Sequence, residues 1–159
     1  TLKAVLKVHP YEEVAYDIYP LKNNGRVQGL GVVGKLDKEM NTNEFIDFVK
    51  NKLNLNNLRG SGPMPNIVRK IAVCSGAGAN YMHKAKFSGA DVFITGDLKY
   101  HDGQTAEEIG LFVIDAGHFS TEIIVIRYLS EYLEECAKKS KANVEIMQST
   151  SGRDTLKVY

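Results

Sequence analysis

The alternation of apolar runs with helical patterns after about residue 66 constrains the fold of this chain most strongly. Apolar runs predict strands and the segments between them predict helices: strands at 67–74, 90–95, 111–114 and 143–148, and helices at 81–88, 103–109 and 120–139. Strands that are apolar on both faces and joined through helices are typical of parallel sheets. We therefore expect an α/β fold with a mixed, largely parallel sheet that is covered by helices.

The beginning of the chain follows a different pattern. Residues 2–8 fit either a helix or a strand, which ends at His9-Pro10 because proline restricts the residue before it. Three features together predict a β-hairpin. Residues 16–21 alternate between the two faces of a half-buried strand, Lys22-Asn23-Asn24-Gly25 is a turn signal, and residues 28–36 form a glycine-studded strand. The chain begins without methionine inside an element, which leads us to expect a fragment or a processed product.

A helix and a loop separate this hairpin from the alternating region. Apolar residues with helical spacing predict a helix from about Lys38 to Leu53, with Thr42 or Asn43 as its N-cap. The segment 54–66 is rich in Asn and Gly and contains two of the four prolines, so we expect a loop or a linker there.

Composition excludes several classes of protein. The 20 Lys and Arg nearly balance the 19 Asp and Glu, which argues against a nucleic-acid partner. No apolar run has the length of a membrane span, and residues 1–6 lack the form of a signal peptide. Cys74 and Cys136 are far apart and form no disulfide or metal motif, so we expect a reducing, cytoplasmic location.

Three glycine-bearing loops follow the predicted parallel strands, at 75–80, 96–102 and 115–122. In open α/β sheets, ligands bind at the carboxyl ends of the strands, so the three loops are where a site is expected. Gly76 and Gly78 have the spacing of a phosphate-binding turn, but a third glycine is missing. A close-packed turn between a strand and a helix is the alternative, and the one we favour.

The third loop carries the best candidate ligands for a metal ion. His118 and Glu122 are four residues apart at the start of a predicted helix, so both side chains point the same way. We expect Ser120 or Thr121 to cap this helix and Glu122 to lie in its first turn. The alternative is an ordinary capped helix with a first-turn acid and a histidine satisfied by hydrogen bonds.

The second loop repeats the spacing with Asp97 and His101, and Asp102 follows His101. A histidine beside carboxylates can bind a metal, orient a ligand or transfer a proton near neutral pH. Two polar residues on an exposed loop are the alternative. The combined nitrogen and oxygen donors suit zinc, iron or manganese. His83 is predicted to lie on a surface or at an interface, and His9 at the end of a strand next to Glu12 or Glu13.

Four stretches occur in the same order in one family of proteins. They are HPYEEVAYDIYPL at 9–21, GLGVVG at 29–34, GDLKYHD at 96–102 and DAGHFSTE at 115–122. With them, the chain resembles the NIF-three-like proteins, which also carry the name GTP cyclohydrolase I type 2 homologue. The resemblance covers essentially the whole chain.

The resemblance implies two α/β lobes around a dinuclear metal centre, with a ferredoxin-like domain inserted in the larger bacterial members. Residues 1–36 then correspond to the closing part of the insertion, and residues 37–159 to the carboxyl-terminal lobe. His118 and Glu122 match the metal ligands of this lobe, His101 matches a histidine that lines the same cleft, and Asp97 is a further candidate ligand. The family's other ligands, a His-His pair and an aspartate, have no counterpart here, so we expect weak metal binding.

The resemblance also implies a function and partners. It implies a hydrolase-like protein in which two divalent ions, zinc, iron or manganese, activate water against a nucleotide or a similar small molecule, with His101 relaying a proton. The alternative is a non-enzymatic, metal-stabilised oligomer that binds or scaffolds other molecules. In both cases the family implies a ring-shaped homo-oligomer, a hexamer, in the whole protein.

Overall fold

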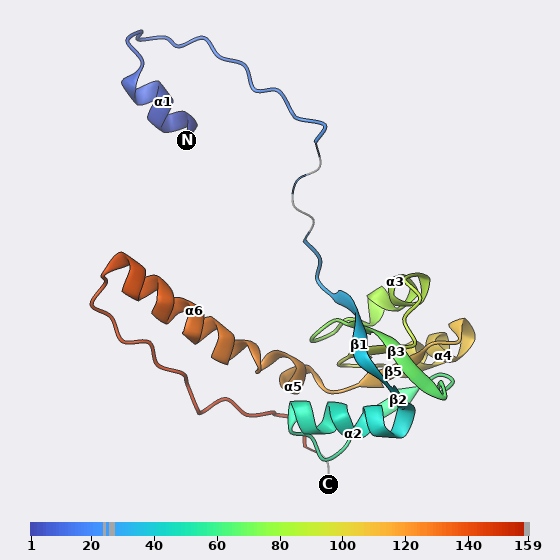
Figure 1. The fold of residues 1–159 in the computed structure, drawn as a ribbon. Helices are drawn as coiled ribbons and strands as arrows, with labels where there is room; N and C mark the ends of the chain where they lie inside the picture. The colour runs from blue at the N-terminus through green and yellow to red at the C-terminus, as the bar shows by residue number, and fades with distance from the viewer. Residues whose placement is uncertain (24, 26–27, 158–159) are drawn as a thin grey trace.

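The structure is a computed structural model that describes residues 1–23, 25 and 28–157. Figure 1 shows the elements, which follow in the order α1 (Leu2–Val8), β1 (Val32–Asn41), α2 (Thr42–Leu53), β2 (Arg59–Ser61), β3 (Ile67–Val73), a 3-10 turn (Ala79–Tyr81), α3 (Met82–Phe87), β4 (Val92–Thr95), α4 (Tyr100–Ile109), β5 (Phe112–Asp115), α5 (His118–Glu122) and α6 (Val125–Ser140).

The five strands form one mixed sheet in the order β1-β3-β4-β5-β2. The three central strands β3, β4 and β5 are parallel, whereas β1 pairs antiparallel with β3 and β2 pairs antiparallel with β5. The structure therefore confirms a mixed α/β fold, and the parallel part is limited to the central strands. In the register of the central strands, Val73 lies opposite Ile94 and Thr95 lies opposite Asp115, so their carboxyl ends are neighbours.

Helices cover both faces of the sheet, as the apolar strands predict. On one face, Phe45 and Val49 of α2 pack with alternate residues of the central strands, among them Ile71, Val92 and Ile114. On the other face, side chains from α3 and α4 pack against the intervening residues: Met82, Ala85 and Ala106 against Ala72, Phe93 and Val113. The alternation of sides along each strand explains why β4 and β5 are buried throughout.

The amino-terminal prediction of a β-hairpin is wrong within the described residues. The segment 16–21 forms no strand, and the second run becomes β1, which crosses residue 36 and pairs with β3. The predicted turn at Lys22–Gly25 includes Asn24, which lies outside the described residues. Residues 2–8 form the helix α1, which has no buried residue and lies apart from the sheet (Figure 1). The domain boundary at residues 36 and 37 stays a prediction.

The predicted strand at 143–148 is also wrong, because this segment has no regular structure. It follows α6, which leads away from the sheet (Figure 1). The segment 143–148 pairs with no strand of the sheet within the described residues. The chain instead runs back beside α6, where Gln148 Nε2 donates a hydrogen bond of 2.6 Å to Ser130 Oγ.

Four predicted boundaries or segments differ in the structure. The N-cap of α2 is Asn41 and not Thr42 or Asn43, because Asn41 and Glu44 form a reciprocal capping box. The helix predicted at 103–109 begins earlier, at Tyr100. The helix predicted at 120–139 is divided into α5 and α6 at Ile123 and Ile124. Part of the predicted loop at 54–66 forms the short edge strand β2.

Among the described residues, no helix combines the length and the apolar character that a transmembrane span requires.

Candidate metal centre

The three loops at the carboxyl ends of the parallel strands are joined by hydrogen bonds. Gly96 N donates to Gly76 O at 2.8 Å and Ala116 N donates to Thr95 O at 2.8 Å, which extends the sheet pattern beyond the strands. Gly76 N donates to Thr121 Oγ1 at 2.9 Å, which ties the first loop to α5. The three loops therefore form one rigid platform, as their positions in the sequence predict.

His118 lies on this platform between two carboxylates. Its Nδ1 contacts Asp97 Oδ2 at 2.6 Å, and its Nε2 lies 3.2 Å from Glu122 Oε2. The three side chains are 46%, 41% and 52% exposed, so solvent and ions have access to them. The structure therefore brings together three of the four candidate residues that the sequence singles out.

The local backbone explains how these side chains meet. Gly117 has φ +80° and precedes α5, so His118 is the first residue of the helix and Glu122 the last. One helical turn separates them and puts both on the same face. Asp97 adopts a left-handed backbone with φ +56°, a conformation that Asp tolerates better than most residues. Asp97 belongs to the loop between β4 and α4, and this loop places the Asp97 carboxylate next to Nδ1 of His118.

The predicted capping of α5 is wrong. Because the helix begins at His118, the hydroxyl groups of Ser120 and Thr121 lie inside it and donate to the carbonyl groups of Ala116 and Gly117. Glu122 correspondingly ends α5 instead of lying in its first turn. Its orientation therefore comes from the shared face with His118 and from the first loop, and not from the helix dipole.

Gly76 forms the floor beneath the two side chains. A Cβ atom at this position would lie 2.5 Å from Glu122 Oε1 and 3.2 Å from His118 Nε2, and the residue has φ +62°. Both the space and the backbone conformation require glycine. Gly78 is equally crowded, because a Cβ atom there would lie 2.6 Å from Thr95 Oγ1. This crowding agrees with the close-packed turn.

The carboxylates also set the protonation of the imidazole. The hydrogen bond to Asp97 is the largest cause that raises the pKa of His118 above its ordinary value, and the charges of Glu122 and Asp97 add to it. A hydrogen bond from Nδ1 to a carboxylate fixes the ring so that Nε2 is the nitrogen available to a metal ion. Asp97 therefore has the position of a residue that orients the histidine.

Asp115, which is 5% exposed, connects the platform to the edge strand β2. Its carboxylate accepts hydrogen bonds from the Arg59 guanidinium, from Leu98 N at 3.2 Å and from Gly117 N at 3.0 Å. These contacts hold the loop of Asp97 and the loop of His118 against each other. Asp115 thus supports the loops around His118. Its position at the start of the stretch 115–122 does not indicate this role in the sequence.

His101, the fourth candidate, lies on the exposed surface of α4. Its Nδ1 contacts Gln104 Oε1 at 2.8 Å, and its ring packs edge-on against Tyr100. It lines neither of the two cavities next to His118. His83 is exposed on α3, as predicted for a surface residue, and His9 follows α1 and accepts a hydrogen bond from Tyr11 N.

His118 and Asp97 lie between two cavities of about 410 and 550 Å³. Residues from the end of the chain line both cavities, in particular Asp154 and Leu156. Sequence reasoning missed this segment, because more than thirty residues separate it from His118 and no motif marks it.

The residues present fit a metal ion only in part. His118 Nε2 and Glu122 Oε2 supply two suitable donors 3.2 Å apart, a separation that two metal–ligand bonds of about 2.1 Å each can span. No group of three or more His, Cys, Asp or Glu side chains suited to a metal occurs within residues 1–23, 25 and 28–157. The described residues thus supply two suitable donors, fewer than a metal site requires.

The fold and this cluster define a class of protein: an α/β lobe with a histidine between two carboxylates at the carboxyl ends of the parallel strands of a mixed sheet. The chain belongs to the Duf34/NIF3 family (NGG1p interacting factor 3), whose family model matches residues 2–154. The expected family is thereby confirmed.

Individual relatives agree with this assignment. A Bacillus subtilis protein named GTP cyclohydrolase 1 type 2 homolog is 43% identical over 151 residues, which are 93% of this chain and 40% of that protein. A Listeria monocytogenes protein of the same name is 41% identical over 96% of this chain and 40% of its own length. The crystal structure of a Bacillus cereus protein related to NIF3 has 40% identity and a TM-score of 0.86, and the match covers 99% of this chain and 43% of that one. The chain thus spans about 40% of the length of the curated relatives it matches.

Proposed function

We propose that the chain is one lobe of a metal-dependent, hydrolase-like protein in which His118 and Glu122 bind a divalent ion. The observation that carries the proposal is the position of Nε2, which faces Glu122 while Asp97 holds Nδ1 on the other side of the ring. Histidines that bind metals usually donate their second ring N–H to a carboxylate in this way.

The surroundings of the two donors support the same proposal. Gly76 leaves space next to both of them, and the three loops around it are fixed by hydrogen bonds. A site held by rigid elements keeps its donors in place before the ion arrives. In this proposal Asp97 orients His118 instead of contacting the ion, whereas its role as a direct ligand remains the alternative.

When bound, a divalent ion would lower the pKa of a water molecule and so make a nucleophile available near neutral pH. The chain's own residues hold and orient the ion. We also propose two ions, zinc, iron or manganese, and further ligands from the part of the longer relatives that this chain does not cover. The proton relay by His101 stays a prediction. The His101 ring lies beside Gln104 and lines neither of the two cavities next to His118.

The substrate we propose is a nucleotide or a similar small molecule, in keeping with the name GTP cyclohydrolase 1 type 2 homolog of the relatives. We place the protein in the cytoplasm, where Cys74 and Cys136 stay reduced; both are free thiols in the structure.

The test is turnover and metal content of the full-length protein with zinc, iron or manganese against a panel of nucleotides. His118→Ala and Glu122→Gln should lower both quantities, whereas His83→Ala, an exposed histidine on α3, should change neither. Absence of turnover at full metal occupancy with every metal and substrate would leave the enzyme proposal without support.

A second candidate function is a metal-stabilised oligomer that binds or scaffolds other molecules. It is favoured by α6, which carries exposed apolar side chains with helical spacing: Val125, Leu129, Tyr132 and Leu133. Such a surface is typical of a contact with another chain or lobe. If this function alone is correct, His101→Ala would leave both metal content and any turnover unchanged, and Leu129→Lys would lower the oligomer mass measured by light scattering.

A further inference from the structure

Two buried threonines hold both backbone polar groups of Gly76, the glycine beneath His118 and Glu122. Gly76 N donates a hydrogen bond to Thr121 Oγ1 at 2.9 Å, and Gly76 O accepts one from Thr95 Oγ1 at 3.0 Å. The side chains of Thr95 and Thr121 come from β4 and α5, and the two residues are only 0% and 6% exposed. The position of Gly76 is therefore fixed by hydroxyl groups that water does not reach.

The two hydroxyl groups are not equally important for Gly76. Gly76 O also accepts hydrogen bonds from Gly96 N at 2.8 Å and from Gly78 N at 3.0 Å, so it keeps partners without Thr95. Gly76 N, in contrast, has no acceptor besides Thr121 Oγ1 within the described part of the chain. A buried N–H group that loses its acceptor is strongly unfavourable. Loss of the Thr121 hydroxyl should therefore make the loop around Gly76 move until its N–H finds another partner.

Thr121 also belongs to the helix that carries the two candidate ligands. In α5 it lies three residues after His118 and directly before Glu122. Its Oγ1 contacts the carbonyl oxygens of Gly117 and His118, each at 2.9 Å, while it accepts the hydrogen bond from Gly76 N. One hydroxyl group thus joins the backbone of His118 to the loop beneath the donors.

We propose that Thr121 is a positioning residue of the metal site: its hydroxyl holds Gly76 beneath His118 and Glu122 and so preserves the space for an ion. This space is narrow, because even a Cβ atom at Gly76 would lie 2.5 Å from Glu122 Oε1 and 3.2 Å from His118 Nε2. A small shift of the loop would therefore bring backbone atoms against the donors. Residues that do not touch a metal ion often control its binding in this way. The inference rests on the proposed function, since it assumes that His118 and Glu122 bind the ion.

The test is an NMR titration of the 159-residue chain with zinc, together with amide hydrogen exchange. Thr121→Val keeps the shape of the side chain but removes the acceptor, so zinc affinity should fall by about tenfold. The amide proton of Gly76 should exchange faster in this variant. Thr121→Ser keeps the hydroxyl and should bind zinc nearly as well as the native chain. Thr95→Val should weaken zinc binding less than Thr121→Val, because Gly76 O keeps two other donors.

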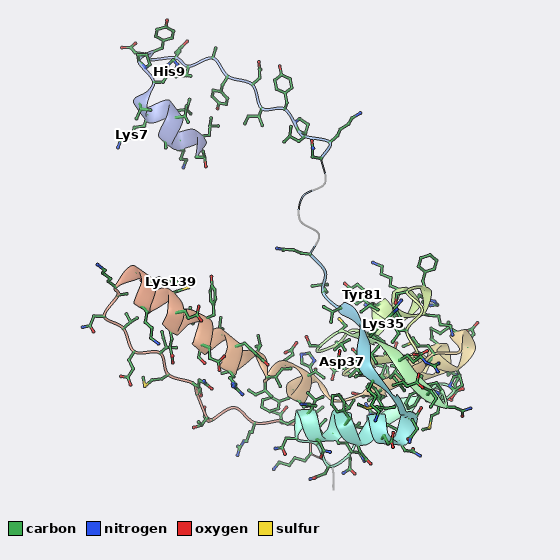
Figure 2. The ribbon with its side chains drawn as sticks, viewed as in Figure 1. Lys7, His9, Lys35, Asp37, Tyr81 and Lys139 are labelled. Atoms are coloured by element: carbon green, nitrogen blue, oxygen red, sulfur yellow. The ribbon has the colours of Figure 1, made fainter. Side chains whose placement is uncertain are left out.

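Thr42→Val is the matched control for the loss of a buried hydroxyl group. Thr42 is 5% exposed and donates a hydrogen bond to Pro65 O. It begins α2, whose first turn lies away from α5 (Figure 1), in the part of the molecule where side chains crowd around the sheet (Figure 2). Thr42→Val should unfold at a lower urea concentration than the native chain, as Thr121→Val should, but its zinc affinity and the exchange of Gly76 should not change.

Three results would overturn the inference while the native chain binds zinc: equal zinc affinity of the native chain and Thr121→Val, an equal loss of affinity in Thr42→Val, or no recovery in Thr121→Ser. Each of them contradicts the role of Thr121 and leaves the metal site intact. A native chain that does not bind zinc at His118 contradicts the proposed function itself, and the positioning role is then overturned with it. The two failures are therefore distinguished by the native chain alone.

Discussion

At the scale of single residues, the proposed metal site depends on the protonation of His118. The carboxylates of Asp97 and Glu122 raise the pKa of His118, and a protonated imidazole has no lone pair for a metal ion. Zinc affinity should therefore be constant above this pKa and fall as the pH drops through it, beginning at a higher pH than for an ordinary histidine. Calorimetric titrations with zinc across this range, with the histidine followed by NMR, test the order of the two events. A zinc affinity that does not change while His118 titrates would contradict the role of Nε2.

Asp97 should act on the metal through His118. Asp97→Asn removes the charge that favours the imidazolium, so the pKa of His118 should fall, and zinc affinity at neutral pH should fall by about tenfold because the ring becomes less basic and less fixed. Asp47→Asn, on the exposed surface of α2, is the control for the loss of one carboxylate. An unchanged zinc affinity in Asp97→Asn with a lowered pKa would show that orientation by Asp97 does not matter.

Gly76 offers a test of the space beneath the two donors. Gly76→Ala should destabilise the fold by at least about 1 kcal/mol, because its backbone is left-handed. It should also lower zinc affinity, since the added Cβ atom would displace Glu122 Oε1. Gly34→Ala is the matched control, because no atom lies within 4 Å of its Cβ position. Urea unfolding and zinc titration of both variants check this, and equal behaviour of the two would remove Gly76 from the site.

The sequence predicted only part of the arrangement around His118. His118 and Glu122 share a face because their spacing matches a helical turn, and this was predictable. The contact between Asp97 and His118 follows from the adjacency of β4 and β5, which the pattern indicated only as neighbouring loops. Gly76 and residues 153–157 approach from distant parts of the chain, and spacing in the sequence carries no information about such contacts.

At the scale of the elements, α2 depends on its capping box. Glu44 N donates to Asn41 Oδ1 at 2.9 Å, and Asn41 N donates to Glu44 Oε2 at 3.2 Å. Asn41→Ala should lower the free energy of unfolding by about 1 kcal/mol. The neighbouring Asn43→Ala, at an exposed position inside the helix, should change it by less than about 0.5 kcal/mol. Urea denaturation followed by circular dichroism distinguishes the two, and the reverse order would place the cap at the sequence-predicted residue.

The central elements were predictable and the peripheral ones were not. The strands β4 and β5 are buried throughout and β3 is partly buried, so their apolar runs stand out in the sequence. The edge strand β2 has only three residues, Arg59–Ser61, and no apolar pattern. The segment 143–148 has an alternating pattern without a sheet within reach. Local pattern thus predicts a strand only where a neighbouring strand is available.

At the scale of the whole molecule, the covered sheet contrasts with the candidate metal centre at its edge. Both faces of the sheet are covered, whereas the candidate metal centre offers two donors at its surface. The chain spans about 40% of the length of its curated relatives. The longer proteins have further segments from which we propose the remaining ligands, so we expect the isolated chain to bind zinc more weakly than a full-length relative.

The binding of zinc to the metal-free chain, followed residue by residue by NMR, tests the central claim most directly, because the method detects weak binding. We predict that zinc shifts the signals of the His118 ring and of the Glu122 carboxylate along one saturable curve, leaves the His83 ring unchanged, and has no such effect in His118→Ala. Zinc that shifts neither residue of the native chain, or that binds His118→Ala with unchanged affinity, would contradict the claim that these two side chains hold the ion.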